Sequence, residues 1–159
     1  MGTGKKEFAF EYGWRVCADY CVRVFHFDTI ESDFRQFAQL LGAQVNASAT
    51  KDLVENIAFR LSELNKRKFL FIFLDVLDYK KIEIYLQEHI LTLKNVKFLL
   101  TMPNENLLPN SQKSLKIKLD LFSRDEAHAY FERFYVRRPK LEENQKRKIF
   151  ELGCMKKSG

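Results

Sequence analysis

An uninterrupted apolar run near the middle of the chain constrains the fold more than any other feature. The run is FLFIFL, residues 69–74, and Asp75 ends it. A strand that faces solvent on one side alternates apolar and polar residues, whereas a strand that is apolar at every position is buried on both faces. A helix needs about 20 apolar residues to cross a bilayer, so a run this short is not a membrane span. It therefore predicts an inner strand of a parallel sheet that is covered by helices on both sides.

Patterns on either side of this run alternate between helical and extended periodicity. Residues 21–27 (CVRVFHF) alternate with period two, residues 96–101 are mostly apolar, and residues 115–119 (LKIKL) alternate again, which predicts three further strands. Apolar residues at helical spacing predict helices over 5–19, 31–41, 50–66, 80–90 and 123–135. We expect the aromatic residues of the first helix to lie in the core, Gly42 to stop the second helix, and Ser123 and Glu126 to form a capping box at the start of the last one. Helices interspersed with strands in this way are typical of an α/β fold with a parallel sheet.

Composition places the chain among ordinary globular proteins. Its 159 residues are enough for one domain, and 46% of them are hydrophobic. The first residues carry no apolar stretch of the signal-peptide type, so we expect no secretion, no transmembrane segment and a cytoplasmic location. The three cysteines, Cys17, Cys21 and Cys154, contain no Cys-x-x-Cys pair. Reduced thiols are the simplest interpretation of that pattern.

The net charge of +6 comes from the end of the chain. Residues 133–159 hold nine Lys and Arg against three Asp and Glu, so the preceding residues are balanced. We interpret residues 136–159 as a basic helical extension with a solvated face. A nucleic-acid or anionic membrane surface would also suit this charge, but the segment carries no nucleic-acid-binding motif, so we expect no nucleic-acid partner.

A candidate phosphate site begins at residue 2. Gly2, Thr3, Gly4 and Lys5 open the first predicted helix, and Lys6 follows. Glycines allow backbone N–H groups to turn toward a phosphate, the helix start adds a positive dipole, and a lysine can reach the terminal phosphates.

Two residues at the ends of predicted strands extend this candidate site. Asp75 ends the apolar strand, where a carboxylate can hold Mg²⁺ beside such a loop, and Thr101 ends the next strand, where a hydroxyl can sense a terminal phosphate.

These motifs resemble the NB-ARC domain of the STAND class of P-loop NTPases. GTGKKEFAFEYGWRV is similar to that family's phosphate loop and first helix, and FLFIFLDVLD is similar to its Walker B strand. VKFLLTMPN and LKIKLDLFSRDEAHAYFER resemble two later segments of the family in the right order. The resemblance implies that residues 1–135 form an incomplete nucleotide-binding domain that binds ADP or ATP and acts as a signalling switch.

The resemblance also implies a specific fold, with one element missing. The fold is a three-layer, P-loop NTPase-like parallel sheet that lacks its first, central strand, because the family carries that strand before the phosphate loop. The missing strand would lie between the strands at 96–101 and 115–119. The strand order that follows is 21–27, 69–74, 96–101, the missing strand, and 115–119.

Three departures from the family pattern concern catalysis. Lys6 replaces the Ser or Thr that ligates Mg²⁺, Val76 replaces the second acidic residue, and Met102 replaces an arginine. An ammonium cannot coordinate a cation, so we expect Mg²⁺ dependence to be weak or absent. With these groups gone, we expect no measurable ATPase activity.

The alternative is a truncated, non-binding pseudo-NTPase that acts as a protein interaction module. The missing strand and Lys6 favour this interpretation. On either hypothesis protein partners are expected, and the sequence does not identify them.

Overall fold

The computed structural model describes residues 4–43, 49–104, 107, 115, 117–120 and 123–131. These residues form helices, three strands and one 3₁₀ turn. In chain order the elements are α1 (Lys5–Val16), β1 (Cys21–His26), η1 (Phe27–Thr29), α2 (Ile30–Leu40), α3 (Thr50–Glu63), β2 (Phe69–Leu74), α4 (Tyr79–Glu83), α5 (Glu88–Leu91), β3 (Val96–Leu100) and α6 (Arg124–Phe131).

The three strands form one parallel sheet in the order β1-β2-β3. Phe69 of β2 lies opposite Cys21 of β1 on one side and Val96 of β3 on the other. All six residues of β2 are buried. The expectation of an apolar inner strand in a parallel sheet is therefore confirmed, and so is the relative order of these three strands.

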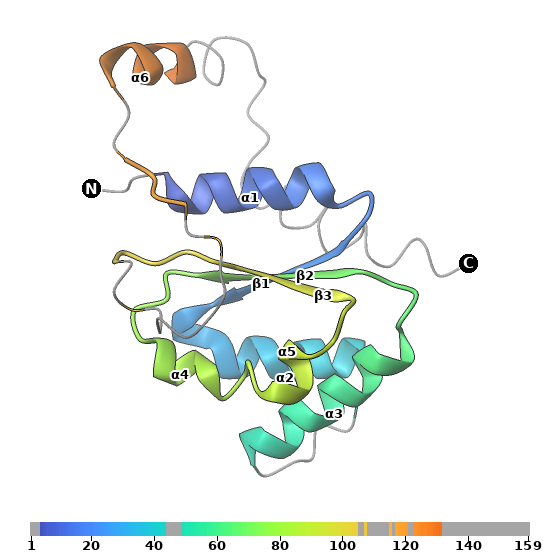
Figure 1. The fold of residues 1–159 in the computed structure, drawn as a ribbon. Helices are drawn as coiled ribbons and strands as arrows, with labels where there is room; N and C mark the ends of the chain where they lie inside the picture. Colours follow the sequence, from blue (N-terminus) through green and yellow to red (C-terminus); the bar gives the residue numbers. More distant parts are fainter. Residues whose placement is uncertain are drawn as a thin grey trace.

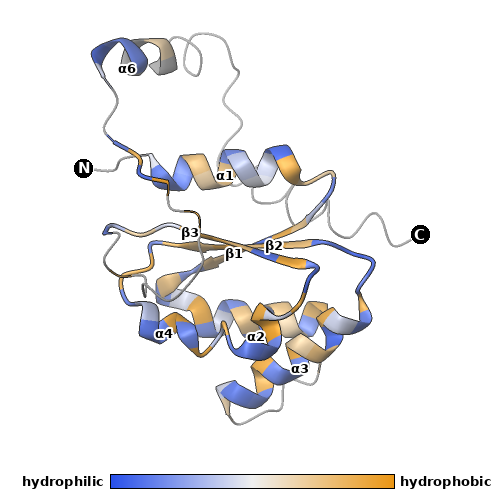
Figure 2. Cartoon of the chain, in the orientation of Figure 1, coloured by the Kyte–Doolittle hydropathy of each residue, from blue (hydrophilic) through white to orange (hydrophobic). Residues whose placement is uncertain are grey.

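Helices cover both faces of the sheet, which gives three layers (Figure 1). Helix α1 lies on one face, and α2, α3, α4 and α5 lie on the other. Apolar residues are concentrated on the strands and on the helix sides that face them (Figure 2). The coarse prediction of a three-layer α/β fold is confirmed.

The two faces of the sheet bury cores of very different size. Alternate residues of β2 point to opposite faces, so Leu70, Ile72 and Leu74 pack with Ala9 of α1 and Val22 of β1. The opposite core, under α2 and α3, is much larger and rich in phenylalanine. Its buried aromatic side chains are Phe25, Phe34, Phe37, Phe69, Phe71, Phe73, Tyr79 and Tyr85.

Local signals at two helix ends are confirmed. Gly42 ends α2 with a φ of 66°, and the N–H of Ala43 donates to the carbonyl of Ala38 at 2.9 Å, a Schellman arrangement. At the start of α6, the N–H of Ser123 donates to a carboxylate oxygen of Glu126 at 2.8 Å. The N–H of Glu126 donates back to the Ser123 hydroxyl at 3.3 Å. This reciprocal pair is the capping box expected from the sequence.

The strand predicted at 115–119 is wrong for the four residues of this range that the structure describes. Leu115 and residues 117–119 are not in a strand, and Leu115 and Ile117 are 90% and 61% exposed. A strand needs a neighbour for its backbone hydrogen bonds, and in the described part of the chain no strand pairs with the outer edge of β3. Alternation of apolar and lysine side chains was therefore not sufficient to form one.

Two other helix predictions also need correction. The single helix expected over 80–90 is two short helices, α4 and α5. Asp78 caps the start of α4, and the residues between Glu83 and Glu88 are not helical. On α1, the aromatic residues expected in the core are partly exposed, with Phe8, Tyr12 and Trp14 at 42%, 44% and 43%. Helix α1 instead buries its small residues Ala9 and Gly13, which allow it to lie close to the sheet.

Several predictions concern residues outside the described ranges. They are the assignments of Gly2 and Thr3, the helix beyond Phe131, and the basic extension at 136–159. Among the helices that the structure describes, none has the length and apolar character needed to span a membrane.

Candidate functional site

The carboxyl ends of the three strands meet at one edge of the sheet because the strands are parallel. The strands end at His26, Leu74 and Leu100, and Asp75 and Thr101 follow directly after two of them. The first turn of α1 reaches the same edge, with Gly4 as its N-cap. In open α/β sheets, ligands bind outside the carboxyl ends of the strands. The described candidate residues therefore lie at the edge where such a site is expected.

Lys6 and Asp75 form an ion pair at this edge. Lys6 projects from the first turn of α1, and Asp75 lies at the end of β2, so the pair links the helix to the sheet. Both side chains are about half exposed, at 49% and 52%. The hydrogen bond with Asp75 raises the pKa of the Lys6 ammonium above its ordinary value, and the negative charges of Glu7 and Asp28 act in the same direction.

The backbone at Asp75 has an unusual conformation that is held in place by Thr101, the residue after β3. Its φ is 54°, in the left-handed region that side chains other than glycine rarely adopt. The N–H of Asp75 donates to the Thr101 hydroxyl at 2.9 Å, and the N–H of Val76 donates to the Thr101 carbonyl at 2.9 Å. Thr101 itself is only 6% exposed and donates its N–H to the Phe73 carbonyl at 2.9 Å. These bonds fix the position from which the Asp75 carboxylate extends.

Thr101 therefore has a structural role that the sequence did not predict. Its hydroxyl oxygen accepts from a backbone N–H next to the candidate site. The sequence placed Thr101 correctly at the end of a strand, but it could not show that the hydroxyl would be engaged by the neighbouring strand.

The start of α1 has the features expected of an anion-binding helix end. Gly4 has a φ of 71°, and among the residues that the structure describes no side chain caps the first turn. The Gly4 carbonyl accepts the first helical hydrogen bond from Phe8 at 2.9 Å. Lys5 and Lys6 add two positive charges to the positive end of the helix dipole.

The groups around Asp75 do not fit a resident Mg²⁺. This cation prefers six oxygen ligands in near-octahedral geometry, whereas the Asp75 carboxylate is paired with an ammonium. Asp78 is the next carboxylate along the chain, and its side chain caps α4 by accepting from the N–H of Lys80 at 2.9 Å. In the described ranges, no three His, Cys, Asp or Glu residues gather in a group that could hold a metal ion. The assignment of a metal to Asp75 stays a prediction from the sequence alone.

The positions expected to carry catalytic groups hold apolar side chains. Val76 is fully buried, and Met102 is partly buried against the larger core. Neither side chain can orient water or donate a hydrogen bond to a phosphate.

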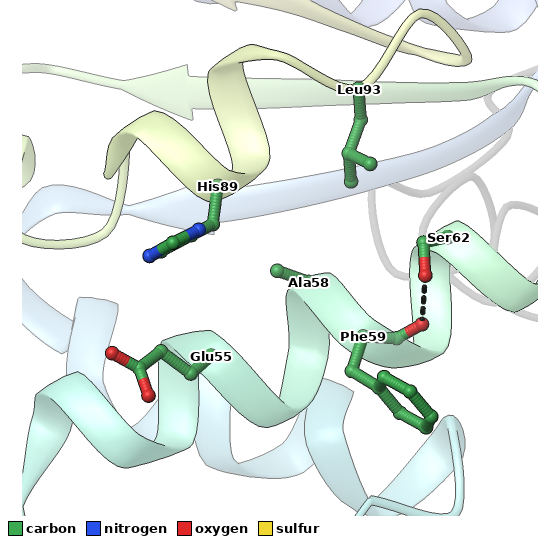
Figure 3. Close-up of a pocket in the computed structure, with 6 residues that line it drawn as sticks. All are labelled: Glu55, Ala58, Phe59, Ser62, His89 and Leu93. Carbon is green, nitrogen blue, oxygen red and sulfur yellow. Dashed lines mark hydrogen bonds between the residues drawn. The ribbon is translucent and has the colours of Figure 1, made fainter.

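A separate pocket lies between α3 and α5, in the helical layer that also contains α2 and α4. Figure 3 shows the charged or polar ends of Glu55 and His89 toward one end of it, with the Ser62 hydroxyl donating to the Phe59 carbonyl at 2.7 Å. Its lining residues are Glu55, Ala58, Phe59, Ser62, His89 and Leu93. None of Gly4, Lys5, Lys6, Asp75 or Thr101 lines this pocket, so it is distinct from the carboxyl-edge site.

Comparison with protein-family models, with curated proteins and with solved structures gave no match for this chain. The resemblance to the NB-ARC domain thus depends on the sequence motifs alone.

Proposed function

We propose that this chain is a degenerate NB-ARC-like domain that binds ADP or ATP through the phosphates at the carboxyl edge of its sheet. One observation carries the proposal: the start of α1, Asp75 and Thr101, far apart in the sequence, meet at that edge. The helix start and Lys5 would supply hydrogen bonds and charge to the phosphates. The P-loop NTPase-like identity of the fold belongs to the same proposal.

The proposed activity is binding without hydrolysis. Phosphoryl transfer depends on a metal, a water-orienting group and positive charge placed at the transferred phosphate. In this chain, Lys6 stands at the position of the metal-ligating hydroxyl, the buried Val76 at that of the second acidic residue, and the partly buried Met102 at that of the arginine. The rate of ATP hydrolysis should therefore fall below detection. By its resemblance, the chain would act as a cytoplasmic signalling switch that works with protein partners.

Calorimetric titration with ADP and ATP tests the proposal. Replacing Lys5 by alanine should weaken binding about 10-fold or more, because a charge-assisted hydrogen bond is lost. The matched control is Lys51→Ala on α3, which removes a lysine whose described partner is Glu55 at 3.9 Å. Equal affinity in the wild type, Lys5→Ala and Lys51→Ala would contradict nucleotide binding at this edge.

One observation favours the alternative function of a protein interaction module. Phe8, Tyr12 and Trp14 of α1 each expose more than two fifths of their surface. Large exposed aromatic side chains are common where proteins meet other proteins. Sedimentation tests this alternative by asking whether the wild type self-associates and whether the double variant Phe8→Ser, Tyr12→Ser does not. If that is the result, and if no nucleotide binds, the interaction module replaces the nucleotide-binding domain as the proposed function.

A further inference from the structure

The Lys6–Asp75 pair gives Asp75 a role opposite to the one its sequence position suggests. In P-loop NTPases, a carboxylate at the end of such a strand holds Mg²⁺. Here the ammonium of Lys6 is in contact with that carboxylate. The N–H of Asp75 donates to the Thr101 hydroxyl, so the backbone that carries this carboxylate has a hydrogen-bond partner other than Lys6.

We infer that Asp75 is the internal counter-ion of Lys6 and not a metal ligand, so that the carboxyl edge accepts metal-free phosphate anions in competition with the Asp75 carboxylate. The class of ligand follows from the proposed function. The role of Asp75 follows from the ion pair itself.

Two physical arguments support this inference. First, an ammonium and a divalent cation repel each other at one carboxylate, so a metal ion would have to displace Lys6 before it could bind. Second, a phosphate that draws Lys6 away leaves the Asp75 carboxylate unpaired beside a like charge. Because both partners are about half exposed, the pair itself is weak and can be broken by a multivalent anion.

The counter-ion role and a metal-ligand role predict opposite changes of binding affinity in Asp75→Asn. Loss of a metal ligand would weaken binding of the magnesium nucleotide. Loss of a counter-ion should instead tighten binding of ADP and of inorganic tripolyphosphate in the presence of EDTA, by about 2- to 5-fold. Asparagine tolerates the left-handed backbone that this position needs, so the turn should keep its shape.

A matched control separates the specific pair from a general change of charge. Asp28→Asn removes one negative charge that also acts on Lys6, but Asp28 is not its ion-pair partner. It should tighten anion binding less than Asp75→Asn does. Equal effects of the two substitutions, or no effect of Asp75→Asn, would overturn the inference.

A second experiment needs no nucleotide. In the wild type, Mn²⁺ should broaden the amide NMR signals of residues 74–76 only as much as it broadens the signals of residues near other exposed carboxylates. In Lys6→Thr, the carboxylate is released and a hydroxyl is added, so broadening at these residues should increase, and it should disappear in the double variant Lys6→Thr, Asp75→Asn. Strong, Asp75-dependent broadening in the wild type would show that Asp75 is a metal ligand.

The two experiments fail in distinguishable ways. If no phosphate compound binds to any variant, the proposed function is wrong, while the Mn²⁺ result still decides the role of Asp75. If ADP binds and Asp75→Asn weakens it without metal, the nucleotide site stands and the counter-ion role is refuted.

Discussion

Replacing Phe25 by alanine should remove a large share of the free energy of unfolding. The Phe25 side chain is 1% exposed and lies at the centre of the larger core. Its ring centroid lies 4.5 Å from that of Phe34, 5.2 Å from Phe73, 5.3 Å from Phe71 and 5.9 Å from Phe37. The substitution would therefore leave a cavity lined by four aromatic rings.

The expected cost is about 4 kcal/mol. Truncation of a buried phenylalanine costs about 3–5 kcal/mol, and the upper half of this range applies when the surroundings cannot collapse. Here two of the neighbouring rings come from the central strand β2 and two from α2, so relaxation is restricted. Since the free energy of unfolding of a domain is about 5–15 kcal/mol, the variant should keep only part of its stability.

Urea unfolding followed by far-ultraviolet circular dichroism measures this cost. With a slope of about 2 kcal/mol per molar urea, the midpoint should fall by about 2 M. Phe59→Ala is the matched control, because the Phe59 side chain is 61% exposed and should lose little. If Phe25→Ala shifted the midpoint no more than Phe59→Ala does, the phenylalanine core would not stabilise the fold in the way described.

Three further predictions concern single contacts. Gly42→Ala should cost about 1 kcal/mol in urea unfolding, because φ is 66° there although the space for a methyl group is open; an unchanged midpoint would contradict this. Thr101→Val should cost about 1–2 kcal/mol, since the Asp75 N–H loses its acceptor, whereas Thr101→Ser keeps the hydroxyl and should keep most of the stability. At α6, hydrogen bonds from Ser123 lower the pKa of Glu126, so the cap is stabilising above the ordinary pKa of glutamate and is lost as the pH falls through the lowered value. The protection factors of the α6 amides, which are corrected for the intrinsic pH dependence of amide exchange, should therefore fall at acid pH in the wild type and change less in Glu126→Gln.

Much of the fold was predictable because its strongest signals are local. A run apolar at every position fixed β2 as the inner strand, and the Ser123–Glu126 spacing fixed the start of α6. The proximity of Asp75 and Thr101 was also predictable, since the carboxyl ends of neighbouring parallel strands lie at one edge of the sheet, and the Asp75 N–H donates to the Thr101 hydroxyl there.

What failed depends on contacts between distant segments. The alternation at 115–119 is a strand pattern only where a neighbouring strand exists to pair with it. The exposure of Phe8 and Tyr12 reflects which side of α1 faces the sheet, and the small residues Ala9 and Gly13 decided that. The Lys6–Asp75 pair joins residues that are distant in sequence, so no spacing rule indicated it.

The unequal cores have a consequence for how the molecule opens. Helix α1 buries only Ala9 and Gly13 fully, whereas the other face of the sheet holds most of the buried aromatic rings. Local opening should therefore release α1 at a lower free energy than the rest, and its amides should exchange with solvent before those of β2. Release of α1 separates Lys6 from Asp75 and removes the helix start from the carboxyl edge. A ligand that bridges this edge would then hold α1 onto the sheet, and slower exchange of the α1 amides would report its binding.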